Sequence, residues 1–166
     1  MKVNIALLTV TDTRTIDNDK SGGILVEKIK ESNHNLIDRK ICKDNKNDIV
    51  LILKDWLKNE KIDAIITTGG TGLTGRDITP EALDEIADKH IPGFGEVFRN
   101  ISLKTVGTSA IQSRACAVLS NGKYVFALPG SSGGVTDAWE GILKYQLDIN
   151  HKPCNFVELF PRLKEK

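Results

Sequence analysis

The pattern of apolar and polar residues predicts β-strands that alternate with helices along most of the chain. A nearly continuous apolar run at residues 3–10 and shorter runs at 35–42 and 62–67 are typical of strands in a parallel sheet. Between the last two runs, apolar side chains recur at the spacing of one helical face, at Ile49, Ile52, Leu53, Trp56 and Leu57. We expect another helix to begin at Ser21.

Three helices and a turn are expected in the second half of the chain. Thr79 and Pro80 favour an N-cap and a first helical position, and residues 92–95 (Pro-Gly-Phe-Gly) favour a turn. The two later helices should carry Val97, Phe98 and Ile101, and Val135, Ala138, Trp139 and Ile142. The polar tail from His151 onward should dock on the domain without forming a helix.

The chain also contains one strong hairpin signal. Asn121-Gly122 separates apolar runs at 116–119 and 124–128, so one antiparallel strand should join an otherwise parallel sheet. We therefore predict a single α/β domain over residues 1–166, with three layers (α/β/α) and a mainly parallel sheet. Ligands bind such sheets beyond the carboxyl ends of the strands, where the loops are residues 11–20, 42–47, 67–78 and 129–134.

The loop after the third strand has the composition of a phosphate-binding site. Its sequence from residue 67 to 77, T-T-G-G-T-G-L-T-G-R-D, holds four glycines and four threonines. Glycine lets the backbone approach a ligand closely, and threonine hydroxyls and backbone N–H groups donate to phosphate oxygens. A simple connection needs only about 2–6 residues. We predict that this loop forms the floor of a site that binds phosphate groups.

Two familiar phosphate-binding motifs match part of this loop in sequence, but the residues and elements around the loop do not meet the requirements of either motif. Residues 70–75 match G-x-G-x-x-G, but the stretch follows the third strand and the next helix begins only at Pro80, so a dinucleotide-binding fold is excluded. A P-loop requires Lys-Ser/Thr where Arg76 and Asp77 stand. The chemistry must therefore come from other groups.

Asp77 and Asp44 are the candidates for metal binding or acid–base chemistry. Each follows one of two neighbouring strands, so both should lie on one rim, and Mg²⁺ at a phosphate site takes one or two carboxylates. Asp44 could instead cap the following helix. Asp77 could instead close an Asx-turn or form a salt bridge with Arg76. Asp12, after the first strand, is a weaker third candidate.

A second glycine- and serine-rich loop, around Gly130 and Ser131, precedes the last helix. Ser131 stands where a helix N-terminus attracts an anion and where serine caps a helix, and the two roles are compatible. Ser113 and Arg114 precede the hairpin, where the arginine could meet a phosphate or form a surface ion pair. These residues extend the predicted site beyond the first loop.

Composition and charge exclude several classes of protein. The net charge of +1 argues against a nucleic-acid partner bound through a broad basic surface, and no apolar run approaches the roughly 18 residues of a membrane span. We see no signal peptide and expect no membrane partner. An odd number of cysteines without metal-type spacing favours free thiols in a reducing cytoplasm, at Cys42, Cys116 and Cys154.

Four motifs, in order over nearly the whole chain, resemble the MoaB/Mog family of molybdenum cofactor biosynthesis. They are TTGGTGLTGRDITPEA (67–82), IPGFGE (91–96), QSR (112–114) and LPGS (128–131), while KPCNF (152–156) is closer to the MoaB branch. The resemblance implies a cytoplasmic molybdopterin-binding protein that forms trimers or hexamers. It also implies an activity, because Mog-type members adenylylate molybdopterin with Mg-ATP and release pyrophosphate.

The resemblance further implies roles for individual residues. Asp77 matches the family's essential aspartate and Asp44 a second aspartate, so we expect both to act in catalysis and to hold Mg²⁺. Contacts with molybdopterin or nucleotide are expected from Thr68, Gly69, Gly70, Thr71, Gly72, Ser113, Gly130 and Ser131. The alternative is a protein of the same pathway that binds molybdopterin without performing chemistry.

Overall fold

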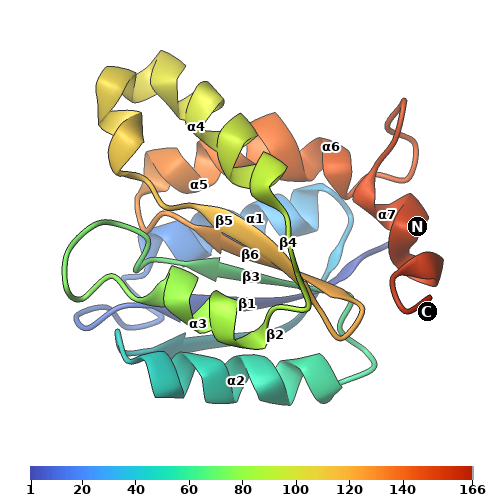
Figure 1. Cartoon of the computed structure of the whole chain (residues 1–166), viewed down its shortest axis with the longest axis horizontal. Coiled ribbons are helices and arrows are strands. Elements are labelled where there is room, and N and C mark those ends of the chain that lie inside the picture. The colour runs from blue at the N-terminus through green and yellow to red at the C-terminus, as the bar shows by residue number, and fades with distance from the viewer. Residues whose placement is uncertain (166) are drawn as a thin grey trace.

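The computed structural model describes residues 1–165 and contains a six-stranded sheet between two layers of helices (Figure 1). The strand order is β2-β1-β3-β6-β5-β4. Of these six strands, β5 alone runs in the direction opposite to the other five. The predicted three-layer fold with one antiparallel hairpin strand is thus confirmed. The strands are β1 (Asn4–Val10), β2 (Asn35–Cys42), β3 (Ala64–Thr68), β4 (Lys89–His90), β5 (Cys116–Ser120) and β6 (Lys123–Leu128).

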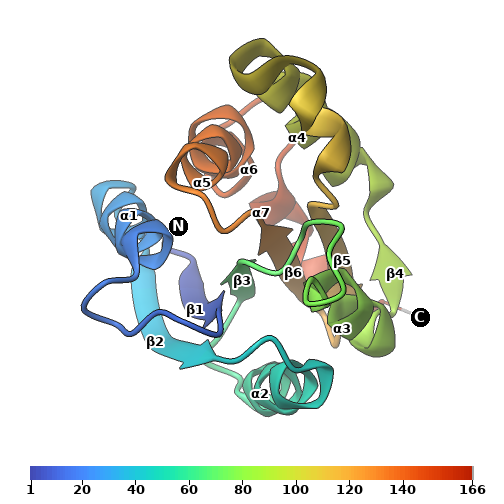
Figure 2. The same ribbon diagram turned by 90° about the vertical axis from the view of Figure 1, so that its left-hand side faces the viewer.

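Helices cover both faces of the sheet and bury a separate apolar core on each (Figure 2). Alternate residues of β1 serve the two cores, with Leu7 in one and Leu8 in the other, which explains its continuous apolar run. Trp56 and Trp139 are buried in these cores, as predicted. The first core contains α1 (Lys20–Glu31), α4 (Pro92–Val106) and α5 (Ser132–Ala138), and the second α2 (Lys46–Lys58) and α3 (Thr79–Ile86).

The turn predicted at residues 92–95 is wrong, because these residues form the first turn of α4. Pro92 favours the start of a helix, since its fixed φ suits a position where no N–H bond is lost. Phe94 is buried against the ring of Phe126, and a Cβ on Gly95 would lie 2.7 Å from the carbonyl oxygen of Ala115. A glycine at this position therefore allows α4 to pack closely against the backbone at Ala115.

The tail docks on the first core, as predicted, but it does so through short helical turns. Phe156 begins α7 (Phe156–Leu159), and its ring lies 4.5 Å from that of Tyr124. The other short elements are the 3₁₀ turns η1 (Gly107–Gln112) and η3 (Phe160–Arg162), the π-helical turn η2 (Trp139–Leu143) and α6 (Lys144–Gln146). Within residues 1–165, no helix is long and apolar enough to cross a membrane.

Candidate functional site

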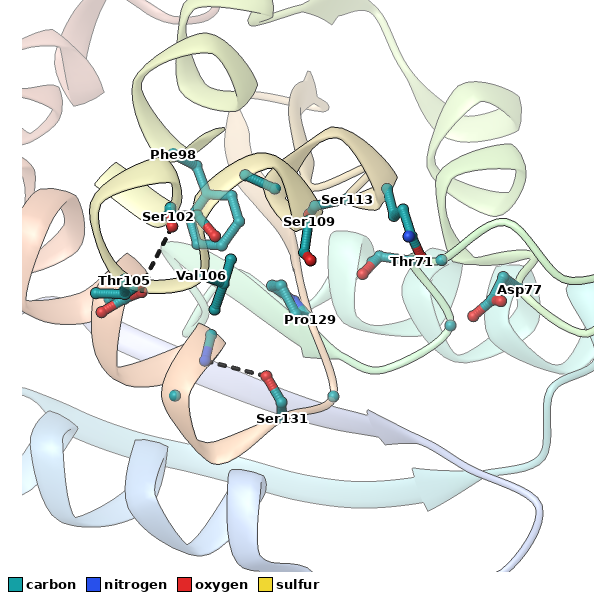
Figure 3. Close-up of a pocket in the computed structure, with 18 residues that line it drawn as sticks. Thr71, Asp77, Phe98, Ser102, Thr105, Val106, Ser109, Ser113, Pro129 and Ser131 are labelled. Atoms are coloured by element: carbon teal, nitrogen blue, oxygen red, sulfur yellow. Dashed lines mark hydrogen bonds between the residues drawn. The ribbon is translucent and has the colours of Figure 1, made fainter. Parts of the chain in front are cut away.

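Two adjoining cavities lie at the carboxyl ends of the parallel strands, between the four loops predicted to meet there. The smaller has a volume of about 240 Å³ and is lined by the loops after β1, β2 and β3. The larger, about 550 Å³, is lined by the loops after β3 and β6 together with α4 and η1 (Figure 3). Gly70 and Gly130 line both cavities and therefore form their common wall.

The glycine loop, which we define as residues 69–77, begins with two glycines that the fold requires. Gly69 and Gly70 have φ angles of +101° and +67°, and a Cβ on Gly69 would lie 2.2 Å from the carbonyl oxygen of Val10. Thr79 was predicted to be a helix N-cap, but Ile78 occupies that position, and the Thr79 hydroxyl donates to the Gly69 carbonyl oxygen at 2.8 Å. These contacts hold the start of the loop against β1 and α3.

The threonines at the end of β3 and within this loop differ in what they offer a ligand. The hydroxyl of Thr68 donates to the carbonyl oxygen of Pro129 at 2.8 Å, so it joins β3 to the second loop. Thr71 is buried and lines the larger cavity, on the side away from Ser131 (Figure 3). Thr74 is exposed, and its hydroxyl donates to the carboxylate of Asp77. Of the three, Thr71 is the one whose side chain faces the larger cavity.

Asp77 lines the larger cavity and closes a turn of the glycine loop. Its Oδ2 accepts from the backbone N–H and the hydroxyl of Thr74, at 2.9 and 2.7 Å. Partial burial raises the pKa of this carboxyl, but hydrogen bonds from Thr74 and Gly72 outweigh burial and hold the pKa below its usual value. Neither predicted alternative for Asp77 is found among the described residues: an Asx-turn would accept from the N–H two residues further on, whereas this carboxylate accepts from Thr74, three residues earlier, and Arg76 pairs with Asp12.

Asp44 lines the smaller cavity and has a different environment. The predicted alternative of helix capping is excluded, because Asn45 caps α2 by accepting from the N–H of Asp48. No side chain of residues 1–165 donates a hydrogen bond to the Asp44 carboxylate, and the backbone N–H of Asp12 is the last of the causes that act on its pKa. Burial, followed by the charge of Asp12, raises the pKa of Asp44. The two candidate aspartates thus lie on the same rim, one at each cavity, but the strands that precede them are not neighbours as predicted, because β1 lies between β2 and β3.

Asp12, the third candidate, is engaged in joining loops. Its Oδ2 accepts from Nε and Nη2 of Arg76 at 2.9 and 2.6 Å, and its Oδ1 accepts from the backbone N–H of Asp44 at 3.2 Å. The guanidinium is the largest cause of the lowered pKa of Asp12. This side chain connects the loops after β1, β2 and β3.

Of the predicted site residues outside the glycine loop, some line the larger cavity and others hold the loops that form it. Ser131 caps α5 by accepting from the N–H of Gly134 at 3.1 Å, and it also lines the larger cavity, so both predicted roles remain compatible. Ser113 lines the same cavity. Arg114 lies on the other side of the glycine loop and pairs with Glu81, which matches the predicted ion pair.

Several lining residues were missed from sequence. Arg14, on the loop after β1, lines the smaller cavity and donates to the carbonyl oxygen of Gly130 at 3.2 Å. Ser109, on η1, projects into the larger cavity beside Phe98 (Figure 3). Ser109 follows Gly107, where α4 ends, and nothing in the sequence around it indicated a binding role. Only the packing of α4 over the second loop brings η1 to the site.

The donor set fits an oxygen-ligated cation better than a dedicated metal cage. The described residues contain no group of three or more His, Cys, Asp or Glu side chains able to hold a metal. The three thiols are unpaired. Burial raises the pKa of Cys42 to about 12 and that of Cys116 to about 11, so neither is a thiolate ligand at neutral pH. Asp44 lines the smaller cavity, and Asp77 and Asp137 line the larger one, where the Asp137 carboxylate already accepts from the hydroxyl of Thr105 at 2.8 Å.

Comparisons of sequence and structure find related proteins. Residues 6–148 match the family described as "Probable molybdopterin binding domain". Molybdenum cofactor biosynthesis protein B of Escherichia coli (strain K12) is 42% identical over 161 residues, 97% of this chain and 93% of that protein. A crystal structure of a molybdenum cofactor biosynthesis protein B has a TM-score of 0.89 at 37% identity and covers 100% of this chain and 98% of its own. That of the tungsten cofactor synthesizing protein MoaB from Pyrococcus furiosus has a TM-score of 0.75 at 34% identity, with 84% and 89% covered.

Proposed function

Because the chain belongs to the MoaB/Mog family of molybdenum cofactor biosynthesis proteins, we propose that it binds molybdopterin and adenylylates it with Mg-ATP. A terminal phosphate oxygen of molybdopterin attacks the α-phosphorus of ATP. The bond from that phosphorus to the oxygen bridging it to the β-phosphorus breaks, and pyrophosphate leaves. The observation that carries the proposal is the pair of adjoining cavities, with Asp44 at one and Asp77 at the other beside their common wall, since the reaction joins two substrates at their phosphates.

The common wall of the cavities is the place we assign to the reacting phosphates. Backbone N–H groups of Gly70 and Thr71 and the capped helix start at Ser131 supply donors there. Gly69, Gly72, Gly130 and Ser113 shape or line the same space, and Thr68 supports it through Pro129. We place the pterin in the larger cavity, whose lining includes Phe98 and Val106.

Asp44 and Asp77 are the residues we assign to the magnesium ion that accompanies ATP. Mg²⁺ at phosphate sites takes one or two carboxylates, phosphate oxygens and water, and it neutralises charge that develops on the phosphates. Asp44 is suited to this because no side chain of the described residues donates to its carboxylate. Asp77 is suited because its lowered pKa keeps it ionised.

The decisive experiment measures pyrophosphate from the purified protein with molybdopterin and Mg-ATP. We expect release with the wild type and none with Asp77→Asn. Asp55→Asn is the matched control, because Asp55 is an exposed aspartate of α2 that lines neither cavity. Binding of molybdopterin without pyrophosphate release would replace the enzyme by the non-catalytic scaffold of the same pathway.

Assembly into a homo-oligomer, a trimer or hexamer, is a further part of the proposal. Four large apolar side chains on α4 and η1 are between 48% and 82% exposed: Val97, Leu103, Val106 and Ile111. Light scattering after size exclusion tests it, and a monomeric mass would refute it. We also propose a cytoplasmic location, in keeping with three unpaired thiols.

A further inference from the structure

We propose that Arg114 is a positioning residue, which holds the glycine loop in the shape that presents Asp77 to the larger cavity. Its guanidinium donates from Nε to the carbonyl oxygen of Gly72 at 2.7 Å and from Nη2 to that of Asp77 at 2.8 Å. Its backbone N–H donates to the carbonyl oxygen of Thr71 at 2.9 Å. One residue thus satisfies three main-chain acceptors of the loop and sets the separation between Gly72 and Asp77.

The middle of the loop has few other anchors. Residues 73–76 are exposed, and the backbone bond within this part of the loop runs from the N–H of Asp77 to the carbonyl oxygen of Thr74 at 3.0 Å. The bond from Arg76 to Asp12 joins two exposed side chains, which contributes little in water. The bonds from Thr74 to the Asp77 carboxylate close the loop on itself and do not attach it to the rest of the fold. The position of the loop between Gly72 and Asp77 therefore depends on Arg114.

Arg114 is itself fixed from α3, the helix that follows the loop. Its Nη1 and Nη2 donate to the two carboxylate oxygens of Glu81, and this guanidinium is the largest cause of the lowered pKa of Glu81. Arg114 lies outside the lining of the larger cavity, so it acts on ligands only through the loop. A lysine offers one ammonium group and cannot span Glu81 and both carbonyl oxygens.

Hydrogen exchange of the glycine loop tests this role without reference to any substrate. We expect Arg114→Lys to speed exchange of the Thr74 and Asp77 amides by about tenfold or more, because the charge-assisted contacts to the carbonyl oxygens of Gly72 and Asp77, which hold the loop in place, are lost. Arg99→Lys is the matched control: Arg99 donates to the carbonyl oxygens of Ser113 and Ala115 but not to the glycine loop. Its exchange pattern in the loop should equal that of the wild type.

A kinetic measurement follows, and it rests on the proposed function. Arg114→Lys should lower kcat for pyrophosphate release at least about tenfold while KM for ATP changes less, because Asp77 is displaced and the substrate cavities remain. If the wild type releases no pyrophosphate, the proposed function fails and the exchange result still decides the role of Arg114. Should Arg114→Lys not fold, Glu81→Gln carries the same exchange expectation. Wild-type exchange in a folded variant overturns the proposal.

Discussion

Replacing Asp44 with asparagine is expected to lower the turnover of the proposed reaction strongly at no loss of stability. No side chain of residues 1–165 donates to the Asp44 carboxylate, and the side-chain oxygen of an asparagine can still accept from the backbone N–H of Asp12, so little is lost on substitution. Burial and the charge of Asp12 raise the pKa of Asp44 above its unfolded value. Ionised Asp44 therefore opposes folding, an effect that is absent below the unfolded pKa and complete above the folded pKa. The free energy of unfolding at pH 7 should stay within about 0.5 kcal/mol of the wild type, on the stabilising side.

The same substitution at Asp19 should have the opposite effect and provides the contrast. Asp19 is buried at the start of α1, accepts from the hydroxyl of Thr9 at 2.6 Å and from the N–H of Gly22 at 2.9 Å, and pairs with Arg39 at 3.0 Å. An asparagine there turns an N–H group toward one of these donors. Breaking a buried pair costs about 3–5 kcal/mol, and we expect about 3 because Arg39 keeps some contact with water.

The assay pairs urea unfolding at pH 7 with pyrophosphate release. Asp44→Asn should retain the unfolding midpoint of the wild type and lose about 10²–10³-fold in kcat, the size of effect seen when one electrostatic contact to a reacting group is removed. Two results would refute the reasoning. One is a destabilised Asp44→Asn, which would reveal a structural partner of this carboxylate. The other is undiminished turnover, which would remove Asp44 from the chemistry.

Three further outcomes test the fold around the site. Burial raises the pKa of Asp19, but hydrogen bonds and the charge of Arg39 outweigh burial and lower it. The stability that ionised Asp19 contributes is therefore present above the unfolded pKa of about 4 and is lost as pH falls through the folded pKa. The loss of unfolding free energy caused by Asp19→Asn, measured by urea unfolding, should accordingly shrink from pH 7 to pH 3. Gly69→Ala should lose at least about 2 kcal/mol, whereas Gly75→Ala, where a Cβ meets nothing within 4 Å, should stay within about 0.5 kcal/mol in the same assay. Iodoacetamide at pH 8, followed by mass spectrometry, should label exposed Cys154 within minutes and only slowly the half-buried thiols of Cys42 and Cys116.

Local sequence patterns predicted an element correctly where its residue types favour a single kind of local structure. Continuous apolar runs became β1 and β6 because a central parallel strand is covered on both faces, and Asn121-Gly122 became the predicted hairpin because Asn121 and Gly122 have positive φ angles. The meeting of four loops also followed from sequence, since the carboxyl ends of parallel strands share one edge. β4 escaped prediction because its two residues, Lys89 and His90, are exposed and pair with β5 only through the backbone.

The partners of the polar side chains were decided by the tertiary structure alone. Arg76 could pair with its neighbour Asp77 and instead binds Asp12, 64 residues away in the chain. The hydroxyl of Thr68 could face a phosphate and instead bonds to Pro129. A charged or hydroxyl group accepts many partners, and the folded backbone determines which of them lies within hydrogen-bond distance. The sequence by itself therefore determined the sheet, the edge that holds the site and the residue types gathered there, and only the tertiary structure decided which of them face the cavities and which support the loops.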